Sequence, residues 1–217
     1  MNRVIVLLSG GIDSATALYL TKQEPSEIYS LNMIYTQSYD SEAEASKKIA
    51  EAAAVKEHLT IYLPFFKDIE RRYHPKPSME ISTAYVPARN IIFYGVAASY
   101  AEALNASSVV FGSNADDAQE LPDAAPNFIR LMNELVRVGT RSGREQASIQ
   151  FVNPLIKYRK SEVLRLAIRL KVPLELTWSC YEDGQVPCGK CRGCLMRQKA
   201  FEEVGTMDPS SSAPTHD

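Results

Sequence analysis

The chain has 217 residues, a formal net charge of −2 at neutral pH and a hydrophobic content of 45%. That length fits one α/β domain with a small appendage, and the composition supports a sizeable core. The slightly acidic charge argues against a DNA- or RNA-binding protein, and no apolar run reaches the ~20 residues of a membrane span. No signal-peptide pattern opens the sequence, so we expect a cytoplasmic protein that contacts neither a membrane nor a nucleic acid.

The first predicted unit is a strand, a turn and a helix. Residues 4–8 are five consecutive apolar residues, which is typical of a buried parallel strand, and residues 15–20 suit a helix. The turn between them, residues 9–14, reads Ser-Gly-Gly-Ile-Asp-Ser. An anion in such a turn would face the free N–H groups at the start of the helix.

The residue types in this turn also favour a phosphate ligand. Gly10 and Gly11 can adopt positive φ and let a ligand approach the backbone, and Asp13 or Ser14 can cap the helix. Glycines alone would suit an ordinary tight turn. The full S-G-G-x-D-S pattern after an apolar strand, however, resembles the pyrophosphate loop of the N-type ATP pyrophosphatases, which cleave ATP between the α and β phosphates. The residues expected to bind ATP are Leu8, Ser9, Gly10, Gly11, Ile12, Asp13, Ser14, Ala15, Thr16, Ala17 and Leu18.

Two more strands are predicted before residue 64. Residues 28–35 and 56–63 have strand character, and the helix between them is expected to begin with a capping box of Ser41 and Glu44. The predicted core face of this helix holds Ala45, Ile49 and Ala53. The alternation of strands and helices predicts a parallel sheet with helices on both faces, in which ligands bind beyond the carboxyl ends of the strands.

The middle of the chain begins with an irregular stretch. Residues 64–87 contain four prolines and are expected to form a long active-site connection, in which His74 is exposed or, as the alternative, catalytic. A helix is predicted over residues 89–104. The residues expected on one side of it are Ile92, Val96, Ser99 and Ala103.

The fourth predicted strand, residues 107–112, ends in a polar loop. Residues 112–117 carry several hydrogen-bonding side chains and should face the same crevice as the turn at residues 9–14, although an ordinary Asn- and Asp-containing turn is the alternative. The remaining predicted segments are a helix over 128–138, a flexible polar stretch over 139–146, a strand over 149–152, a helix over 160–171 with Val163, Leu166, Ala167 and Leu170 on one face, and a fraying tail after Gly205.

All four cysteines lie close together, at Cys180, Cys188, Cys191 and Cys194. Gaps of two residues let successive thiolates converge on one ion, and the glycines among them let the backbone fold around it. Four thiolates suit tetrahedral zinc or an iron–sulfur cluster, and a closed four-cysteine zinc site holds structure rather than activating water. Free thiols and thiol redox chemistry are the alternatives.

The turn and the cysteine segment together resemble the 7-cyano-7-deazaguanine synthase (QueC) family of the PP-loop ATP pyrophosphatases. The other matching segments are Tyr35-x-Gln37 with Glu42, Val86-Pro87-x-Arg89-Asn90, Gly112-x-Asn114-Ala115-x-Asp117, Pro122-Asp123, Pro154-Leu155, Lys160-x-Glu162 and Thr177-Trp178-Ser179-Cys180-Tyr181. The resemblance implies a Rossmann-like α/β fold of the adenine nucleotide alpha hydrolase type with a C-terminal zinc knuckle of four cysteines. It implies a PP-loop domain over residues 1–172, a zinc-binding segment over 173–205 and a flexible tail over 206–217.

The resemblance also implies an ATP-dependent ligase that uses Mg²⁺ and Zn²⁺. The carboxylate of 7-carboxy-7-deazaguanine would attack the α-phosphorus of ATP, and ammonia would displace AMP to give the amide. A second ATP would activate the amide oxygen, and loss of AMP would leave 7-cyano-7-deazaguanine, a precursor of queuosine and archaeosine. Members of the family tend to form homodimers, so a homodimer is expected here as well.

Several residues acquire expected roles from this resemblance. Ser9, Asp13 and Ser14 of the turn are expected to be catalytic, and an ionised Asp13, which only accepts hydrogen bonds, would hold Mg²⁺ or orient loop N–H groups. Arg89 and Lys160 are the expected phosphate contacts, with a solvated surface position as the alternative. The residues expected to read the guanine-like ring are Asn114, Asp117 and Asp123, and the expected metal ligands are Cys180, Cys188, Cys191 and Cys194.

The chain departs from the family pattern at two places. Ala124-Ala125 follow Pro122-Asp123 where the family has Cys-Arg, and Tyr39 stands where the family has histidine. The first alternative is therefore a related enzyme that joins the activated carboxylate to another amine, such as a protein N-terminus. A tRNA thiolase and a non-catalytic nucleotide-binding module are further alternatives.

Overall fold

The computed structural model describes residues 2–35, 40–74, 85–146 and 149–210. Within these ranges the chain forms a five-stranded sheet in the order β3-β2-β1-β4-β5, with every neighbouring pair parallel. The strands are β1 (Asn2–Leu7), β2 (Ser26–Ile34), β3 (Glu57–Tyr62), β4 (Ser108–Val110) and β5 (Gln150–Val152). The strand order reverses direction at β1, which makes the carboxyl end of β1 a position where α/β sheets bind ligands. The predicted parallel α/β fold is confirmed.

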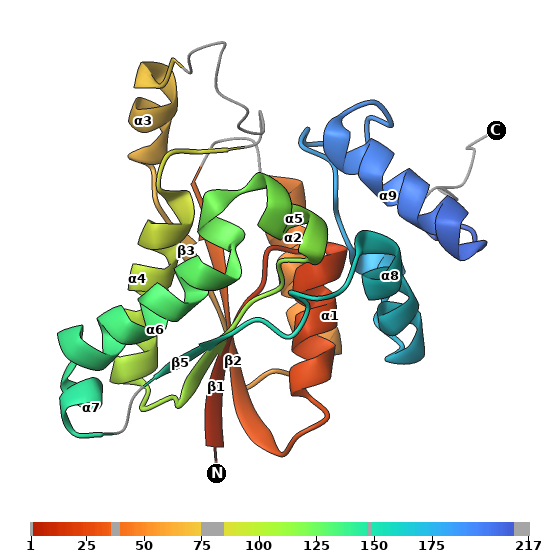
Figure 1. Cartoon of the computed structure of the whole chain (residues 1–217). Coiled ribbons are helices and arrows are strands. Elements are labelled where there is room, and N and C mark those ends of the chain that lie inside the picture. Colours follow the sequence, from red (N-terminus) through yellow and green to blue (C-terminus); the bar gives the residue numbers. More distant parts are fainter. Residues whose placement is uncertain (1, 36–39, 75–84, 147–148, 211–217) are drawn as a thin grey trace.

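Helices cover both faces of the sheet (Figure 1). They are α1 (Ile12–Thr21), α2 (Asp40–Ala52), α3 (Phe66–Arg72), α4 (Arg89–Ala103), α5 (Ala115–Glu120), α6 (Pro126–Gly139), α7 (Arg141–Arg144), α8 (Lys160–Arg169) and α9 (Arg192–Val204), with 3₁₀ turns at Pro122–Ala124 and Leu174–Leu176. Alternate strand residues point to opposite faces, so Val4 and Val6 pack with α1, α2, α8 and α9, while Ile5 packs with α4 and α6. The sheet is thus the middle of three layers.

Two helical predictions are wrong in detail. Helix α2 begins at Asp40, so Ser41 is already inside it, and its hydroxyl group donates to the Gly184 carbonyl oxygen at 3.0 Å instead of forming a capping box. Its predicted core face is correct, since Ala45, Ile49 and Ala53 are buried. Helix α4 buries a different face from the predicted one. The residues that it buries are Tyr94, Ala97, Ala98 and Ala101.

Two stretches predicted to be irregular contain helices. Helix α3 lies within residues 64–87, of which residues 75–84 are outside the described ranges, and His74 before them is exposed. Helix α7 lies within residues 139–146, and the hydroxyl group of Thr140 caps it by accepting a hydrogen bond from the Gly143 N–H at 3.0 Å. Both helices are short, so neither has a clear hydrophobic period in the sequence.

The C-terminal helix α9 was not predicted. Cys191 is its N-cap and Cys194 lies within it, and it packs beside α8, burying Ala200 and Phe201 in the core next to α1 and α8. The segment predicted as a tail is described as far as Ser210, and Asp208 within it forms an ion pair with Arg197. None of the helices in the described part of the chain combines the length and the apolar character that crossing a membrane requires.

Candidate functional site

The turn at residues 9–14 joins the carboxyl end of β1 to α1. Gly11 is the N-cap of α1 and no side chain caps this end, so the prediction that Asp13 or Ser14 caps the helix is wrong. The Ser14 hydroxyl group instead donates to the Gly11 carbonyl oxygen at 3.0 Å and accepts from the Ser9 N–H at 3.2 Å. The two serine hydroxyl oxygens lie 3.1 Å apart, which closes the turn on itself.

Gly10 is the residue of the turn that requires positive φ. Its φ is +91°, and a Cβ there would lie 2.6 Å from the Glu42 carbonyl oxygen, so only glycine fits between the turn and α2. Gly11 has φ −80°, so it does not use the positive φ that glycine permits. Gly112, after β4, makes a second close approach, because a Cβ would lie 2.6 Å from the Asp13 carbonyl oxygen.

Most side chains of the predicted ATP-binding stretch face the core. The buried ones are Leu8, Ile12, Ser14, Ala15, Thr16, Ala17 and Leu18. A ligand at this stretch would therefore meet backbone N–H groups and the polar atoms of Ser9 and Asp13. The first helical hydrogen bond of α1 is donated by Ala15 to Gly11 at 3.0 Å, which leaves the preceding N–H groups of the helix start for other acceptors.

Asp13 is the meeting point of three elements. Its Oδ2 lies 2.6 Å from Lys160 Nζ at the start of α8 and accepts from Asn114 Nδ2, at the exit of β4, at 3.2 Å. Lys160 is held in turn by its backbone N–H, which donates to Asp116 Oδ2 at 3.1 Å. Asp13 Oδ1 is buried and has no hydrogen-bond partner in the described part of the chain. A buried carboxylate oxygen is costly without a donor or a cation, so this oxygen fits a divalent metal ion.

Asn114 and Asp117, which we predicted to bind the guanine-like ring, also form the N-terminal cap of α5. Asn114 is the N-cap of α5: its Oδ1 accepts from the N–H groups of Asp116 and Asp117, and its own N–H donates to Asp117 Oδ2 at 3.0 Å. Burial, followed by the nearby Asp13 carboxylate, raises the pKa of Asp117. Both side chains therefore already serve as a cap next to Asp13, and their contact with a substrate ring stays a prediction.

A second polar group lies around the start of α4. Arg89 donates from Nη1 to the Tyr35 hydroxyl group at 2.9 Å and stacks on the Tyr35 ring. Asp123 is buried, and its backbone carbonyl oxygen accepts from Asn90 Nδ2 at 3.2 Å. The N-cap before Arg89 is Ala88, which has φ +55°. A non-glycine residue in this region is strained, and such strain is frequent at functional sites.

Glu42 belongs to this second group although we assigned it no role from the sequence. Burial raises its pKa to about 7, the Arg89 guanidinium opposes this rise, and the Asp183 carboxylate adds to it. Its position in the first turn of α2 gave no signal beyond its match to the family segment. The neighbouring Gln37 and Tyr39 lie outside the described residues.

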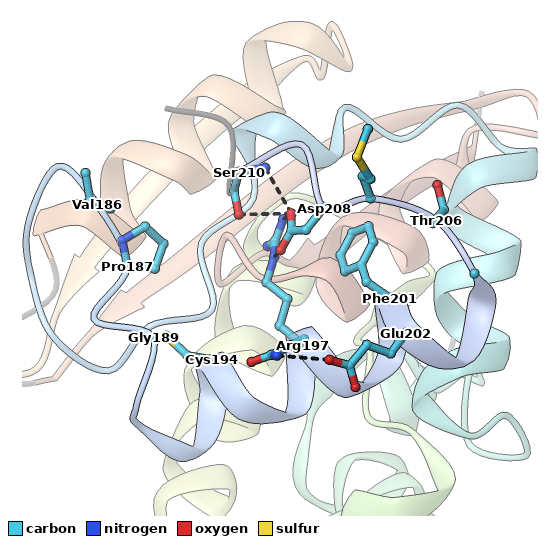
Figure 2. A pocket seen from close by; sticks show the side chains of 13 residues that line it. Val186, Pro187, Gly189, Cys194, Arg197, Phe201, Glu202, Thr206, Asp208 and Ser210 are labelled. Atoms are coloured by element: carbon cyan, nitrogen blue, oxygen red, sulfur yellow. Dashed lines mark hydrogen bonds and ion pairs between the residues drawn. The ribbon is translucent and has the colours of Figure 1, made fainter. Parts of the chain in front are cut away.

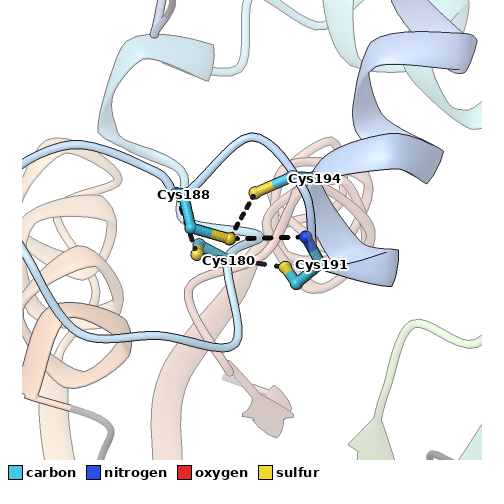
Figure 3. A group of neighbouring side chains, drawn as sticks. All are labelled: Cys180, Cys188, Cys191 and Cys194. Carbon is cyan, nitrogen blue, oxygen red and sulfur yellow. Dashed lines mark hydrogen bonds between the residues drawn. The ribbon is translucent and has the colours of Figure 1, made fainter.

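The four cysteines converge as their spacing predicts (Figure 3). Their four sulfur atoms lie within 4.8 Å of one another. Backbone N–H groups of residues 182 and 188 donate to Cys180 Sγ, and that of residue 191 donates to Cys188 Sγ, each at 3.3 Å. N–H donors lower the pKa of Cys188 to about 6, whereas burial raises the pKa of Cys194. Four convergent sulfurs with N–H donors fit a tetrahedral metal ion with no open position.

The cysteine segment also touches the turn at residues 9–14. The Trp178 N–H donates to the Gly10 carbonyl oxygen at 2.9 Å. On the other side, Ser41 of α2 binds Gly184 through its hydroxyl group, and the Ser41 N–H donates to Asp183 Oδ1 at 3.1 Å. The predicted ATP site and the cysteine cluster are therefore neighbours, and the cysteine segment contacts both the turn at residues 9–14 and α2.

Comparison with known proteins identifies relatives over nearly the whole chain. The family described as Queuosine biosynthesis protein QueC matches residues 3–205. The 7-cyano-7-deazaguanine synthase of Trichodesmium erythraeum is 42% identical, over 95% of this chain and 99% of the relative. The enzyme of the same name from Thermosynechococcus vestitus is 43% identical, over 95% of this chain and 94% of the relative.

A solved structure with a similar fold is more distant in sequence. A 4-thiouridine synthetase in complex with RNA and ATP has a TM-score of 0.55 and 17% identity, and the match covers 94% of this chain and 50% of that one. At this identity the likeness concerns the fold alone.

Proposed function

Because the chain belongs to the QueC family, we propose that this enzyme makes 7-cyano-7-deazaguanine for queuosine biosynthesis by adenylating the carboxylate of 7-carboxy-7-deazaguanine with ATP. The proposal rests on the half-buried Asp13 carboxylate, whose Oδ1 is buried and which lies at the N-terminus of α1 between Lys160 and Asn114. This arrangement combines an anion-binding helix end with a carboxylate oxygen suited to a metal ion.

In this proposal the turn at residues 9–14 holds the β and γ phosphates of ATP. Backbone N–H groups of the turn, together with the Ser9 hydroxyl group, would donate to the phosphate oxygens. Asp13 would hold Mg²⁺, which neutralises phosphate charge when it is bound. Lys160 forms an ion pair with Asp13, so its ammonium group would place a positive charge beside the phosphates.

The chemistry is a displacement at the α-phosphorus. A carboxylate oxygen of the substrate bonds to the α-phosphorus as the bond to the pyrophosphate oxygen breaks, which gives an acyl-adenylate and pyrophosphate. Ammonia then displaces AMP to give the amide, and a second ATP activates the amide oxygen before AMP leaves. The protein supplies mainly orientation and charge stabilisation. The substrate would be positioned by Arg89 at the start of α4, by Asn114 and Asp117 at the start of α5, and by Asp123 in the following 3₁₀ turn.

The four-cysteine cluster would hold a structural Zn²⁺. Its closed set of thiolates matches the ligands that zinc prefers, and it leaves no coordination position for water. In this arrangement residues 1–172 form the catalytic domain, residues 173–205 the zinc segment and residues 206–217 the tail. We further propose a cytoplasmic ligase that acts as a homodimer and takes free ammonia.

The two departures from the family pattern, at Ala124-Ala125 and Tyr39, affect the choice of the amine that attacks the activated carboxylate. Ala124 is buried and Ala125 is the N-cap of α6, directly after Asp123. An arginine at this place would add a positive charge beside Asp123 and Asn90. Its replacement by alanine motivates the alternative in which another amine, such as a protein N-terminus, captures the activated carboxylate.

A product analysis separates these possibilities. The enzyme is incubated with 7-carboxy-7-deazaguanine, ATP, Mg²⁺ and ammonium, and the products are weighed by mass spectrometry. The proposal predicts the nitrile, AMP and pyrophosphate. Accumulation of the amide alone, or a mass added to a protein, would support the alternative, and the absence of AMP would contradict adenylation.

A further inference from the structure

Arg197 is a buried arginine on α9 that no part of the proposed chemistry uses. It is 4% exposed, although it lies beside an open pocket of about 640 Å³ between the cysteine loop and residues 205–210. Figure 2 shows its guanidinium group pointing across this pocket to Asp208. A buried guanidinium group is costly unless its five N–H donors find acceptors.

The acceptors of Arg197 come from two separate segments. Its Nε and Nη2 donate to the two carboxylate oxygens of Asp208 at 2.6 Å and 2.8 Å. Its Nη1 donates to the Thr177 hydroxyl group at 2.7 Å and to the Thr177 carbonyl oxygen at 3.2 Å, and Nη2 also reaches the Leu174 carbonyl oxygen at 3.1 Å. One side chain therefore fixes α9, residues 174–177 and residue 208 together.

The residue after Thr177 contacts the turn at residues 9–14. The Trp178 N–H donates to the Gly10 carbonyl oxygen at 2.9 Å. A trans peptide is planar, with its C=O and N–H groups on opposite sides. Holding the Gly10 carbonyl oxygen toward Trp178 therefore turns the Gly11 N–H away from Trp178 and toward the inside of the turn, where it lies 3.4 Å from the Ser9 hydroxyl oxygen.

We propose that Arg197, paired with Asp208, is a positioning residue that sets the orientation of the Gly10–Gly11 peptide for phosphate binding. It acts through Thr177 and the Trp178 N–H and touches neither the phosphates nor the metal-binding sulfurs. The inference rests on the proposed binding of ATP at this turn. It makes the C-terminal segment a determinant of ATP affinity, beyond any role of the cysteine cluster.

The test uses two conservative variants and one matched control. Arg197→Lys keeps the positive charge but has three donors in place of five, and Asp208→Asn keeps the size but removes the negative charge. The control is Glu145→Gln. It removes the carboxylate of an exposed ion pair between Glu145 and Arg141 of α7, at the opposite end of the sheet. The probe is α,β-methylene-ATP with Mg²⁺, and its dissociation constant is measured by calorimetry.

We expect the dissociation constant to rise about tenfold for Arg197→Lys and about fivefold for Asp208→Asn, because each variant weakens charged hydrogen bonds. The control should bind as the parent protein does. The kcat at saturating ATP and the bound-metal content should stay unchanged in both variants. Unchanged affinity in both variants, with only a lower Tm, would show that Arg197 is merely structural and would overturn the inference.

A second readout does not depend on activity. The chain has one tryptophan, so selective ¹⁵N-tryptophan labelling gives a single backbone amide resonance for Trp178. The inference predicts that this resonance moves when α,β-methylene-ATP binds, and that Asp208→Asn speeds its hydrogen exchange. A parent protein that binds the probe through Asp13 but with an unmoved Trp178 amide contradicts the inference alone. A parent protein that does not bind the probe, or binds it without Asp13, contradicts the proposed function.

Discussion

The turn at residues 9–14 and the cysteine cluster reach their geometry in different ways. The turn is closed by its own hydrogen bonds between Ser9, Gly11 and Ser14, so its shape is present before any ligand binds. The cysteine cluster brings four sulfur atoms within 4.8 Å, an arrangement whose main stabilisation comes from a metal ion. One site is therefore preorganised by hydrogen bonds within the turn and the other depends on its ion, while the Trp178–Gly10 hydrogen bond connects them.

The largest expected effect comes from removing the negative charge of Asp13. Asp13→Asn weakens the pairing with Lys160 and removes the carboxylate oxygen that fits a metal ion. We expect AMP formation to fall at least about 100-fold, as when a charge-stabilising group is lost from an active site. The measurement is the initial rate of AMP release, read by chromatography.

The control for this change is Asp68→Asn on α3. Asp68 is exposed and pairs with Arg71 and Arg72 of its own helix. Its replacement should leave the rate of AMP release within about twofold, because exposed ion pairs contribute little. Equal losses in the two variants would contradict a specific role for Asp13.

Removing the metal ion from the cysteine cluster should have the next largest effect. Chelation followed by dialysis is expected to lower the Tm by about 10 °C, because the binding energy of a structural metal ion is part of the folding energy. The affinity for α,β-methylene-ATP should fall as well, since residues 174–180 lose their support beside Gly10. Thermal unfolding measures the Tm and calorimetry measures the affinity, and added Zn²⁺ should restore both values. An unchanged ATP affinity in the metal-free protein would show that the two sites are independent.

Alanine substitutions at two glycines, one beside the cysteine cluster and one far from it, should change the Tm less than metal removal does. A Cβ at Gly193 would lie 1.9 Å from the Ser179 carbonyl oxygen, whereas a Cβ at Gly95, in α4, would meet no described atom within 4 Å. Gly193→Ala is expected to lower the Tm by about 5 °C and to reduce bound metal, because the backbone beside Cys180 must move.

Gly95→Ala should leave the Tm unchanged or raise it slightly, because alanine favours a helix interior over glycine. Thermal unfolding and metal analysis on both variants check this pair. A metal content that is equal in the two variants would contradict the tight fit at Gly193.

The smallest predicted effect concerns Glu42. Its pKa is raised from the ordinary value of 4.5 to about 7, so the folded state favours the protonated form. The resulting stability is fully present below the unfolded pKa and is lost as the pH rises through about 7. Glu42→Gln should therefore unfold about 2 to 3 °C above the parent protein at pH 8 and close to it at pH 5. A difference that grows toward low pH would contradict this assignment.

The first three strands were predictable because residues 4–8 form an apolar run, residues 28–35 have strand character and residues 56–63 alternate between polar and apolar side chains. Residues 4–8, 28–35 and 56–63 all correspond to parallel strands β1, β2 and β3. The core face of α4 was predicted wrongly because apolar and small residues surround the whole helix, so no single period stands out. Helix α9 was missed because its buried positions include Cys194 and Arg197, which do not read as hydrophobic.

The candidate site was predictable only where chemistry and spacing coincide. The cysteine spacing alone predicts convergence, because a metal ion requires it, and the glycine-containing turn predicts an anion site. The pairing of Asp13 with Lys160 joins residues 147 positions apart, and no local pattern contains it. The capping role of Asn114 and the raised pKa of Glu42 likewise arise from tertiary contacts.

The proposed role of the turn at residues 9–14 is to hold ATP while a carboxylate is adenylated. It is tested most directly with substrate whose carboxylate carries ¹⁸O. Attack by this carboxylate on the α-phosphorus transfers one ¹⁸O to AMP, which mass spectrometry detects, and Asp13→Asn should form almost none of this labelled AMP. AMP without ¹⁸O, or labelled AMP formed equally well by Asp13→Asn, would contradict this role of the turn.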